Sequence, residues 1–148
     1  LFISTQWSVG DNSQVDAGIR YSDQQAESAG VNFDDSGTVG NLGFSHQLEN
    51  LKLFARADQS FRYATVEEHT NVPFGSAPGL KTQQGLSIEI GAELNRANSR
   101  YRGTLYQINL EDEIAFDSSG FSNLNLDKTE RNGVILEMNT DDFPVSAP

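Results

Sequence analysis

The 148-residue sequence contains no cysteine, and this absence excludes structural disulfides, thiolate metal sites and cysteine catalysis. Proline is scarce, with only four residues, and no continuous apolar run exceeds three residues. A transmembrane helix needs about 20 consecutive apolar residues, so we expect no membrane-spanning helix.

Positive charge is also in short supply. Ten basic residues face 21 acidic ones, which gives a formal net charge of −11 and a pI of about 4.4. Such a chain repels phosphate backbones, so nucleic acid is not an expected partner. The acidic residues are spread through polar stretches instead of forming one tail, as is typical of solubilising loop charge.

The remaining composition is polar but patterned. Hydrophobic residues make up 36% of the chain, and glycine, with 13 residues, is frequent. The apolar residues are too few for a large core between two layers, yet the sequence is too regular and too aromatic for a disordered chain. A closed barrel with a wet interior reconciles these facts, because each of its strands needs only one apolar face.

Period-two alternation of apolar and polar residues is the dominant signal, and it predicts strands with one apolar face. The clearest segment alternates Leu86, Ile88, Ile90, Ala92 and Leu94 with Ser87, Glu89, Gly91, Glu93 and Asn95. Six further segments have the apolar sets Leu1/Ile3/Trp7/Val9, Val15/Ala17/Ile19/Tyr21, Leu42/Phe44/Leu48, Leu51/Leu53/Ala55/Ala57, Tyr106/Ile108/Leu110 and Val134/Leu136/Met138. By the same alternation, four apolar residues are placed on the polar side: Phe2, Phe54, Leu105 and Ile135.

The connections alternate strictly between short and long. Short turns are expected at Gly10–Ser13, Glu49–Asn50 and Arg96–Ser99, and long polar loops at 23–36, 66–83 and 111–123. Short turns at one rim and long loops at the other are typical of bacterial outer-membrane barrels. Several strands also reach ten residues, which suits a tilted bilayer crossing better than a globular sheet.

The predicted fold class is therefore all-β, an antiparallel meander of about seven long strands that forms an incomplete section of a transmembrane β-barrel. Seven strands cannot close a porin-sized barrel. The sequence opens inside a predicted strand and stops in a predicted turn, so we expect a fragment of a longer protein.

From the fourth predicted strand onward the sequence resembles the TonB-dependent outer-membrane receptors. Five boxes follow the family's order. Leu51–Glu68 resembles its "SFRAP…E" segment, Ala77–Thr82 its "NPxLKPE" box and Ser87–Leu94 its "E-x-G" strand. Leu105–Ile114 resembles its "F-x-I-x-x-x-D-x-I" strand, and Asn125–Glu137 its "N-x-x-x-x-x-x-x-G-x-E-x-E" strand. Gly18–Tyr21 is similar to the family's "GxRY" strand. Ala64 is a departure, because the family usually has proline there.

The resemblance implies a 22-stranded, plugged transporter in the outer membrane of a Gram-negative bacterium. Residues 1–148 would be a partial barrel domain that lacks the plug, the Ton box and the barrel ends. The implied function is import of a ferric siderophore or similar iron chelate, energised by TonB through the missing plug region. Outer-membrane lipid and lipopolysaccharide would surround the wall, and neither an enzymatic activity nor a cofactor is expected.

Alternatives remain within and outside the family. Haem, cobalamin or an oligosaccharide is an alternative cargo for the same architecture. A passive porin-like channel would share the barrel but lack the boxes from Phe61 to Glu137, and a soluble β-sandwich binding module would have strands of about six residues.

Candidate chemical groups are few. The two histidines, His46 and His69, do not have a metal-site spacing. His46 falls on an apolar face, and His69 is interpreted as a solvated loop residue, with haem ligation as the alternative. The acidic run Glu111–Glu113 with Asp117 lacks the rhythm of an EF-hand and is interpreted as loop charge.

Five charged residues project to the polar side by parity and are the candidates for a lumen-facing role: Arg62, Glu89, Glu93, Arg131 and Glu137. We expect them to form ion pairs within the wall and with a plug. The alternative is that some of them line the path of an anionic, aromatic ferric chelate, for which arginine is a suitable partner.

Overall fold

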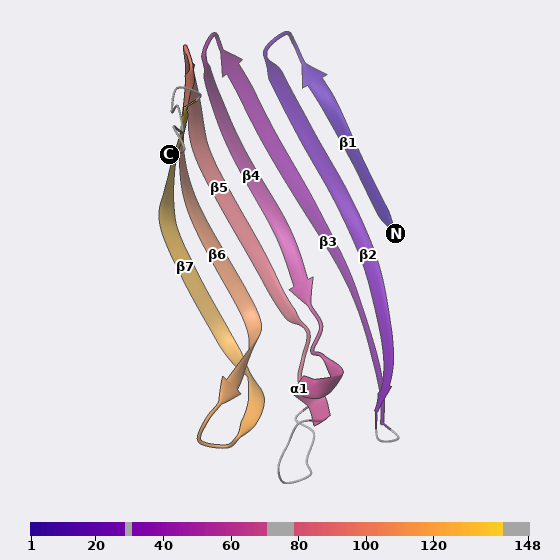
Figure 1. The fold of residues 1–148 in the computed structure, drawn as a ribbon. Helices are drawn as coiled ribbons and strands as arrows, with labels where there is room; N and C mark the ends of the chain where they lie inside the picture. Colours follow the sequence, from indigo (N-terminus) through magenta and orange to yellow (C-terminus); the bar gives the residue numbers. More distant parts are fainter. Residues whose placement is uncertain (29–30, 71–78, 141–148) are drawn as a thin grey trace, which may run out of the picture.

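The computed structural model describes residues 1–28, 31–70 and 79–140 as one seven-stranded antiparallel sheet with its strands in sequence order (Figure 1). The elements are β1 (Phe2–Val9), β2 (Ser13–Ser28), β3 (Val31–Leu48), β4 (Leu51–Arg62), α1 (Val66–Thr70), β5 (Gln83–Arg96), β6 (Ser99–Asp117) and β7 (Ser122–Thr140). This confirms the all-β meander. Within the described ranges, no helix is long and apolar enough to cross a bilayer.

The strand register sorts the side chains into two faces. Paired residues in neighbouring antiparallel strands point to the same side of a sheet. One row across all seven strands is entirely apolar: Trp7, Val15, Phe44, Ala55, Ile90, Leu105 and Val134. The adjacent row, on the opposite face, is mostly polar: Gln6, Asp16, Gly43, Arg56, Glu89, Tyr106 and Gly133.

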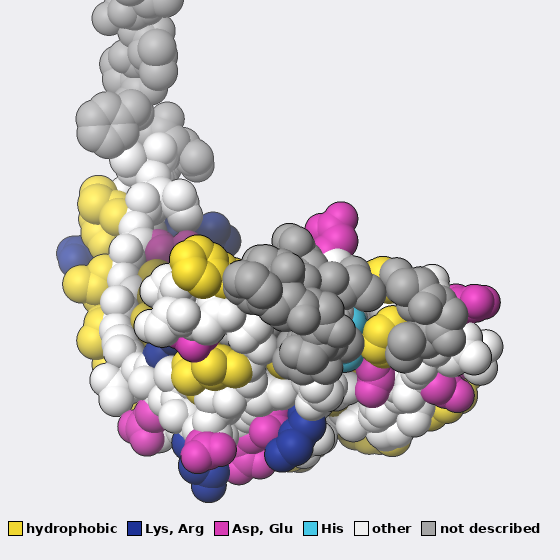
Figure 2. All heavy atoms as spheres, turned by 90° about the horizontal axis from the view of Figure 1, so that it is seen from below, with side chains coloured by type: hydrophobic (Ala, Val, Ile, Leu, Met, Phe, Trp, Pro, Cys, Tyr) yellow, Lys and Arg dark blue, Asp and Glu magenta, His cyan; other side chains and the backbone are white. Residues whose placement is uncertain are grey.

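The apolar face is open and lies on the outside of the curve. Ile90 is 51% exposed, whereas Glu89 on the other face of the same strand is half-buried. In the end-on view, hydrophobic side chains predominate on the outer edge at the left (Figure 2). The facing predicted for residues 86–94 is thereby confirmed. So large an apolar face on a sheet marks a contact surface, for which a bilayer is a natural partner.

The facing predicted for β6 was wrong. Leu105 pairs with Ile90 and Val134 on the apolar face, so Tyr106 and the alternate residues after it lie on the polar face. Both parity sets of this strand contain apolar residues, so its sequence alone did not decide the choice. A register that differs by one residue reverses every side chain. Phe2, Phe54 and Ile135 do lie on the polar face, as predicted.

Two of the three predicted long loops were also wrong. The β2–β3 ladder continues to the pair Ser28–Val31, and the β6–β7 ladder to Asp117–Ser122, so most of 23–36 and 111–123 is strand. These extensions are rich in acidic and amide side chains, with a few apolar residues such as Phe116, Leu124 and Leu126 among them, which gives them the composition of loops. The backbone groups of these segments still gain from ladder hydrogen bonds, so the strands continue through a polar composition.

The short turns are confirmed between β1 and β2, β3 and β4, and β5 and β6. Glu49 and Ala97 adopt φ values of 46° and 48° in two of them. These three turns lie at one end of the sheet, and the other three connections lie at the opposite end with α1 (Figure 1). We call the latter the loop end. In the predicted loop 66–83, residues 71–78 lie outside the described residues.

The β3–β4 ladder stops well before either of its two strands ends. Their last pair toward the loop end is Asn41–Asp58, although β3 extends to Val31 and β4 to Arg62. On either side, the β2–β3 and β4–β5 ladders continue. The two strands therefore separate toward the loop end (Figure 1).

Candidate functional site at the loop end of the sheet

The connection that follows β4 is fixed by specific hydrogen bonds. The Tyr63 hydroxyl donates to the Ser22 carbonyl of β2 at 2.7 Å. Thr65 then caps α1: its Oγ1 accepts from the Glu68 N–H at 3.2 Å, while Glu68 Oε2 accepts from the Thr65 N–H at 2.8 Å. This reciprocal capping box satisfies two N–H groups that a helix start leaves open. A single helical turn is thus held in a defined position.

Glu68 also joins α1 to strands on both sides. Its carboxylate pairs with Arg62 of β4, and its backbone carbonyl accepts from Asn123 Nδ2 of β7 at 3.2 Å. Burial tends to raise the pKa of Glu68, but the Thr65 N–H and Arg62 outweigh it, and the net pKa is lower than usual. Glu68 is therefore an ionised anchor near neutral pH.

His69 is buried, which corrects the expectation of a solvated loop residue. It is 5% exposed, and its ring stacks on Phe33 of β3 with centroids 4.3 Å apart. Among the residues that the structure describes, neither ring nitrogen has a hydrogen-bond partner. The stacked Phe33 ring covers one face of the imidazole. Within the described residues, no group of three or more potential ligands surrounds a metal position.

Lys81 and Thr82 attach the end of the same connection to both neighbouring hairpins. Asn125 of β7 binds the Lys81 backbone twice: its Oδ1 accepts from the N–H at 2.8 Å and its Nδ2 donates to the carbonyl at 3.0 Å. Lys81 Nζ lies 3.3 Å from Asp112 Oδ1 of β6. Thr82 Oγ1 donates to Asp35 Oδ1 of β3 at 3.1 Å.

Glu113 forms a second charged cluster on the β6–β7 hairpin. Thr129 Oγ1 donates to its carboxylate at 2.6 Å, and Arg131 forms an ion pair with it. The Thr129 hydrogen bond, with help from Arg131, lowers the pKa of Glu113 despite partial burial. Asp112, directly before it, has a φ of 54°, which turns the strand at this point.

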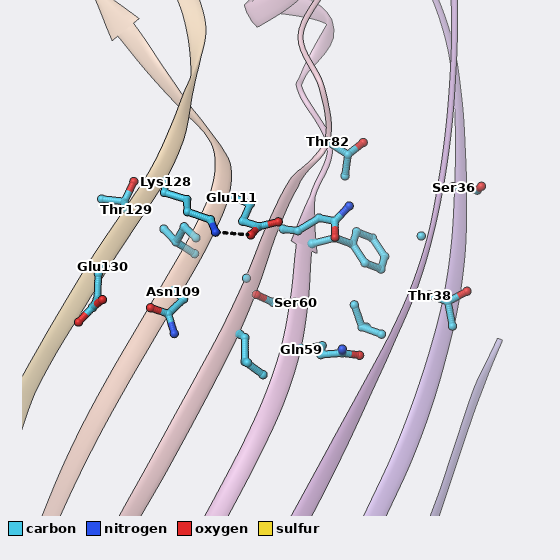
Figure 3. Close-up of a pocket in the computed structure, with 17 residues that line it drawn as sticks. Ser36, Thr38, Gln59, Ser60, Thr82, Asn109, Glu111, Lys128, Thr129 and Glu130 are labelled. Atoms are coloured by element: carbon cyan, nitrogen blue, oxygen red, sulfur yellow. Dashed lines mark ion pairs between the residues drawn. The ribbon is translucent and has the colours of Figure 1, made fainter.

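A cavity of about 780 Å³ lies where β3 and β4 separate. We call it the β3–β4 cavity. Its lining combines hydroxyl, amide and a few apolar side chains from β3 to β7 and the preceding Thr82: Ser36, Gly37, Thr38, Val39, Gln59, Ser60, Phe61, Thr82, Gln84, Gly85, Leu86, Asn109, Leu110, Glu111, Lys128, Thr129 and Glu130. In Figure 3, Ser36 and Thr38 lie on one side and the Lys128–Glu111 ion pair on the other. Ligand sites commonly have this size.

The structure does not gather the five candidate residues into one site, although their ladder positions place all of them on the polar face. Arg62 pairs with Glu68, Arg131 with Glu113, and Glu137 with Arg102 at 3.6 Å. Glu93 lies opposite Arg102 in the ladder, and Glu89 opposite Arg56. Their role in a lumen stays a prediction.

Several loop-end residues were missed by the sequence reasoning. The Thr65–Glu68 capping box was visible as a T-x-x-E signature. Asn125 opens one of the family's boxes, but nothing in the sequence indicated its partner Lys81. Asp35 and Phe33 carried no signal, because their partners are distant in the sequence.

The family is settled by comparison with known proteins. The model of the family "TonB dependent receptor-like, beta-barrel" matches residues 1–145. The chain belongs to the TonB-dependent receptor family. Its place is therefore the outer membrane of a Gram-negative bacterium, where a barrel wall carries its apolar face toward lipid. This is a family of transport receptors and not of enzymes.

Solved structures agree with this assignment at the level of the fold. The chain is similar to "Copper transporter OprC", with a TM-score of 0.80 and 17% identity over 97% of this chain and 25% of that one. The apoprotein FrpB iron transporter of Neisseria meningitidis gives a TM-score of 0.78 and 17% identity over 96% and 23%. The ferric yersiniabactin uptake receptor FyuA of Yersinia pestis gives 0.75 and 16% over 97% and 24%. The chain thus spans about a quarter of the length of these receptors.

Proposed function

We propose that this chain is a section of the barrel wall of an active importer that takes up a ferric siderophore or a similar iron chelate, energised by TonB. The observation that carries the proposal is the family match over residues 1–145. Two of the similar structures are named for iron or for a ferric chelate, which favours iron over the other cargoes of the family. A third is named for copper, so a copper chelate is the second candidate.

The geometry is compatible with this role in two ways. The polar face offers charged side chains to a solvated interior, while the apolar face suits lipid. At the loop end, side chains from β3 to β7 surround a cavity into which a small ligand would fit. In a receptor of this topology the loop end is the extracellular end, so cargo would arrive there first.

The test uses the full-length receptor in a strain that lacks its own. Removal of the connection between β4 and β5, residues 66–82, should abolish binding of the ferric chelate to whole cells. The barrel should still insert, because removal of a connection leaves the hydrogen-bonded wall intact. Growth with the chelate as sole iron source would be lost together with binding.

The control for this deletion is the variant Glu89→Arg, which changes the polar face of β5 away from the connection between β4 and β5. It should reduce growth on the chelate more than surface binding, because Glu89 faces the interior and not the loop end. A parallel arm with a copper chelate or haem identifies the cargo class. Unchanged uptake after removal of the connection would defeat the receptor proposal and favour a passive channel.

A further inference from the structure

The edge of β3 that faces β4 is unpaired next to the β3–β4 cavity. The Gly40 N–H donates to the Gln59 side-chain Oε1 at 3.1 Å, so this backbone group points toward β4. Backbone groups of every second residue in a strand point to the same side. Those of Thr38 and Ser36 therefore also point toward β4, into the cavity that both residues line.

No ladder pair satisfies these groups. The β3–β4 ladder ends at Asn41–Asp58, and for residues 1–28, 31–70 and 79–140 the structure shows no other partner for the backbone of Ser36 or Thr38 on that side. Unpaired strand edges are templates for another extended backbone. The unpaired edge of β3 runs from Val31 to Gly40, and its Ser36 to Val39 part lines a cavity of about 780 Å³.

Two side chains keep the strands apart. Gln59 places its amide where the next ladder bond to Gly40 would form. The Phe61 ring lies against Gly37, so closely that a Cβ on Gly37 would be 2.8 Å from Phe61 Cδ1. The Arg20 guanidinium lies 4.9 Å from the centroid of the same ring. The opening is thus a packed feature of the wall.

We propose that the β3–β4 cavity is a binding site for an extended peptide backbone, which adds to the β3 edge by β-augmentation at Ser36 and Thr38. Main-chain hydrogen bonds would supply affinity, and the surrounding side chains a moderate selectivity. The ligand is a short peptide or the peptide part of a larger molecule. This site is independent of whether the transported cargo is an iron chelate.

A saccharide is the competing occupant, because the lining is rich in hydroxyl and amide groups. Such a ligand would be recognised by side chains and would not need the alternating donors and acceptors of a strand edge. The open β3 backbone favours the peptide. The distinction is testable, because the two ligands depend on different atoms of the same residue, Thr38.

The experiment measures binding to the purified full-length receptor in detergent by calorimetry. The probes are the acetylated and amidated tetrapeptide Val-Thr-Val-Thr, its two analogues with N-methyl groups on alternate amides, and maltotetraose. We expect the parent peptide to bind, and one of the two N-methylated analogues to bind about tenfold more weakly or worse, since it loses the donors that face β3. Binding of neither the peptide nor its analogues would overturn the proposal.

Two substitutions at one position separate backbone from side-chain recognition. Thr38→Pro removes the N–H that points into the cavity but leaves the β2–β3 ladder intact, as proline is tolerated on a strand edge. Thr38→Pro should lower the affinity of the receptor for the tetrapeptide about tenfold or more, whereas Thr38→Val should change that affinity less than about twofold. Ser36→Pro is a second variant in case Thr38→Pro does not fold, which heat-dependent gel mobility would reveal.

Equal losses for Thr38→Val and Thr38→Pro would overturn the proposal, since the hydroxyl and not the backbone would then be recognised. Binding of maltotetraose that is lost in Thr38→Val would establish the saccharide instead. Iron uptake that persists without peptide binding would reject this site and leave the transport proposal intact. Peptide binding without iron uptake would support this site and reject the transport proposal.

Discussion

The half of the sheet near the short turns and the half at the loop end hold together by different means. In the first half every strand pairs with its neighbours, and one face is apolar across the whole width. In the second half most side chains are polar, with a few apolar ones such as Leu124 and Leu126, and the β3–β4 ladder is missing. There, side chains such as Asn125 and Glu68 bind the connection to its neighbours.

The difference shows that a repeated apolar–polar pattern specifies one half of the wall and individual residue pairs specify the other. A repeated binary pattern defines the lipid-facing half, so that any apolar side chain of suitable size serves at a given position. The loop end depends on individual pairs, each with its own geometry. We expect the first half to tolerate conservative apolar changes and the second to respond to single polar substitutions.

The largest effect is expected from a charge on the apolar face. Ile90→Arg should lower the free energy of unfolding of the full-length receptor in a bilayer by about 2–4 kcal/mol, the usual cost of arginine near the midplane. Asn109→Arg is the matched control, because Asn109 lies on the same face but closer to the loop end. If equilibrium denaturation shows equal losses of stability for the two variants, the two halves do not differ in their contact with lipid.

A smaller and more local effect is expected from Asn125→Leu. The variant loses both hydrogen bonds to the Lys81 backbone, each of about 1 kcal/mol, and also the hydrogen bond from Asn125 Nδ2 to the Asp112 carbonyl. The Lys81 amide should then exchange with solvent about 30-fold faster, while amides of β5 keep their protection. Asn132→Leu is the control, since Asn132 makes only a 3.5 Å contact with Glu130. Unchanged exchange at Lys81 would mean that Asn125 does not fix the connection.

Loss of the α1 cap should cost about 1 kcal/mol of local stability. In Thr65→Ala the Glu68 N–H loses its acceptor, so amide exchange across α1 should accelerate. Thr65→Ser retains the hydroxyl and should behave nearly as the parent. If serine and alanine accelerate exchange equally, the β-branched side chain and not the cap would be the cause.

The smallest effect concerns pH. The pKa of Glu113 in the folded protein lies below its usual value of 4.5. The ionised carboxylate therefore stabilises the fold above about pH 4.5, and this contribution is lost as pH falls through the lower folded pKa. Because Arg131 is 54% exposed, the Arg131–Glu113 pair contributes at most about 1 kcal/mol. Glu113→Gln should remove this acid dependence of β6–β7 amide exchange, and an unchanged profile would assign it to another carboxylate.

The fold could be predicted from the sequence near the short turns but not at the loop end. The apolar alternation of residues 86–94 predicted the correct face, because one parity set is uniformly apolar. In β6 both sets contain apolar residues, and the pairing of Leu105 with Ile90 was needed to decide. The extensions of β2, β3, β6 and β7 were missed because their apolar residues, such as Leu124 and Leu126, are few among acidic and amide side chains. The burial of His69 depends on Phe33, which is distant in the sequence and which no local pattern indicates.

The two attachments at Lys81 and Thr82 have a mechanical consequence. Adjacent residues connect in opposite directions, Lys81 to β6 and β7 and Thr82 to β3. Lys81 and Thr82 therefore link the β2–β3 hairpin to the β6–β7 hairpin. A displacement of either hairpin is therefore transmitted to the other across the opening, which Gln59 and Phe61 hold apart in the wall beneath.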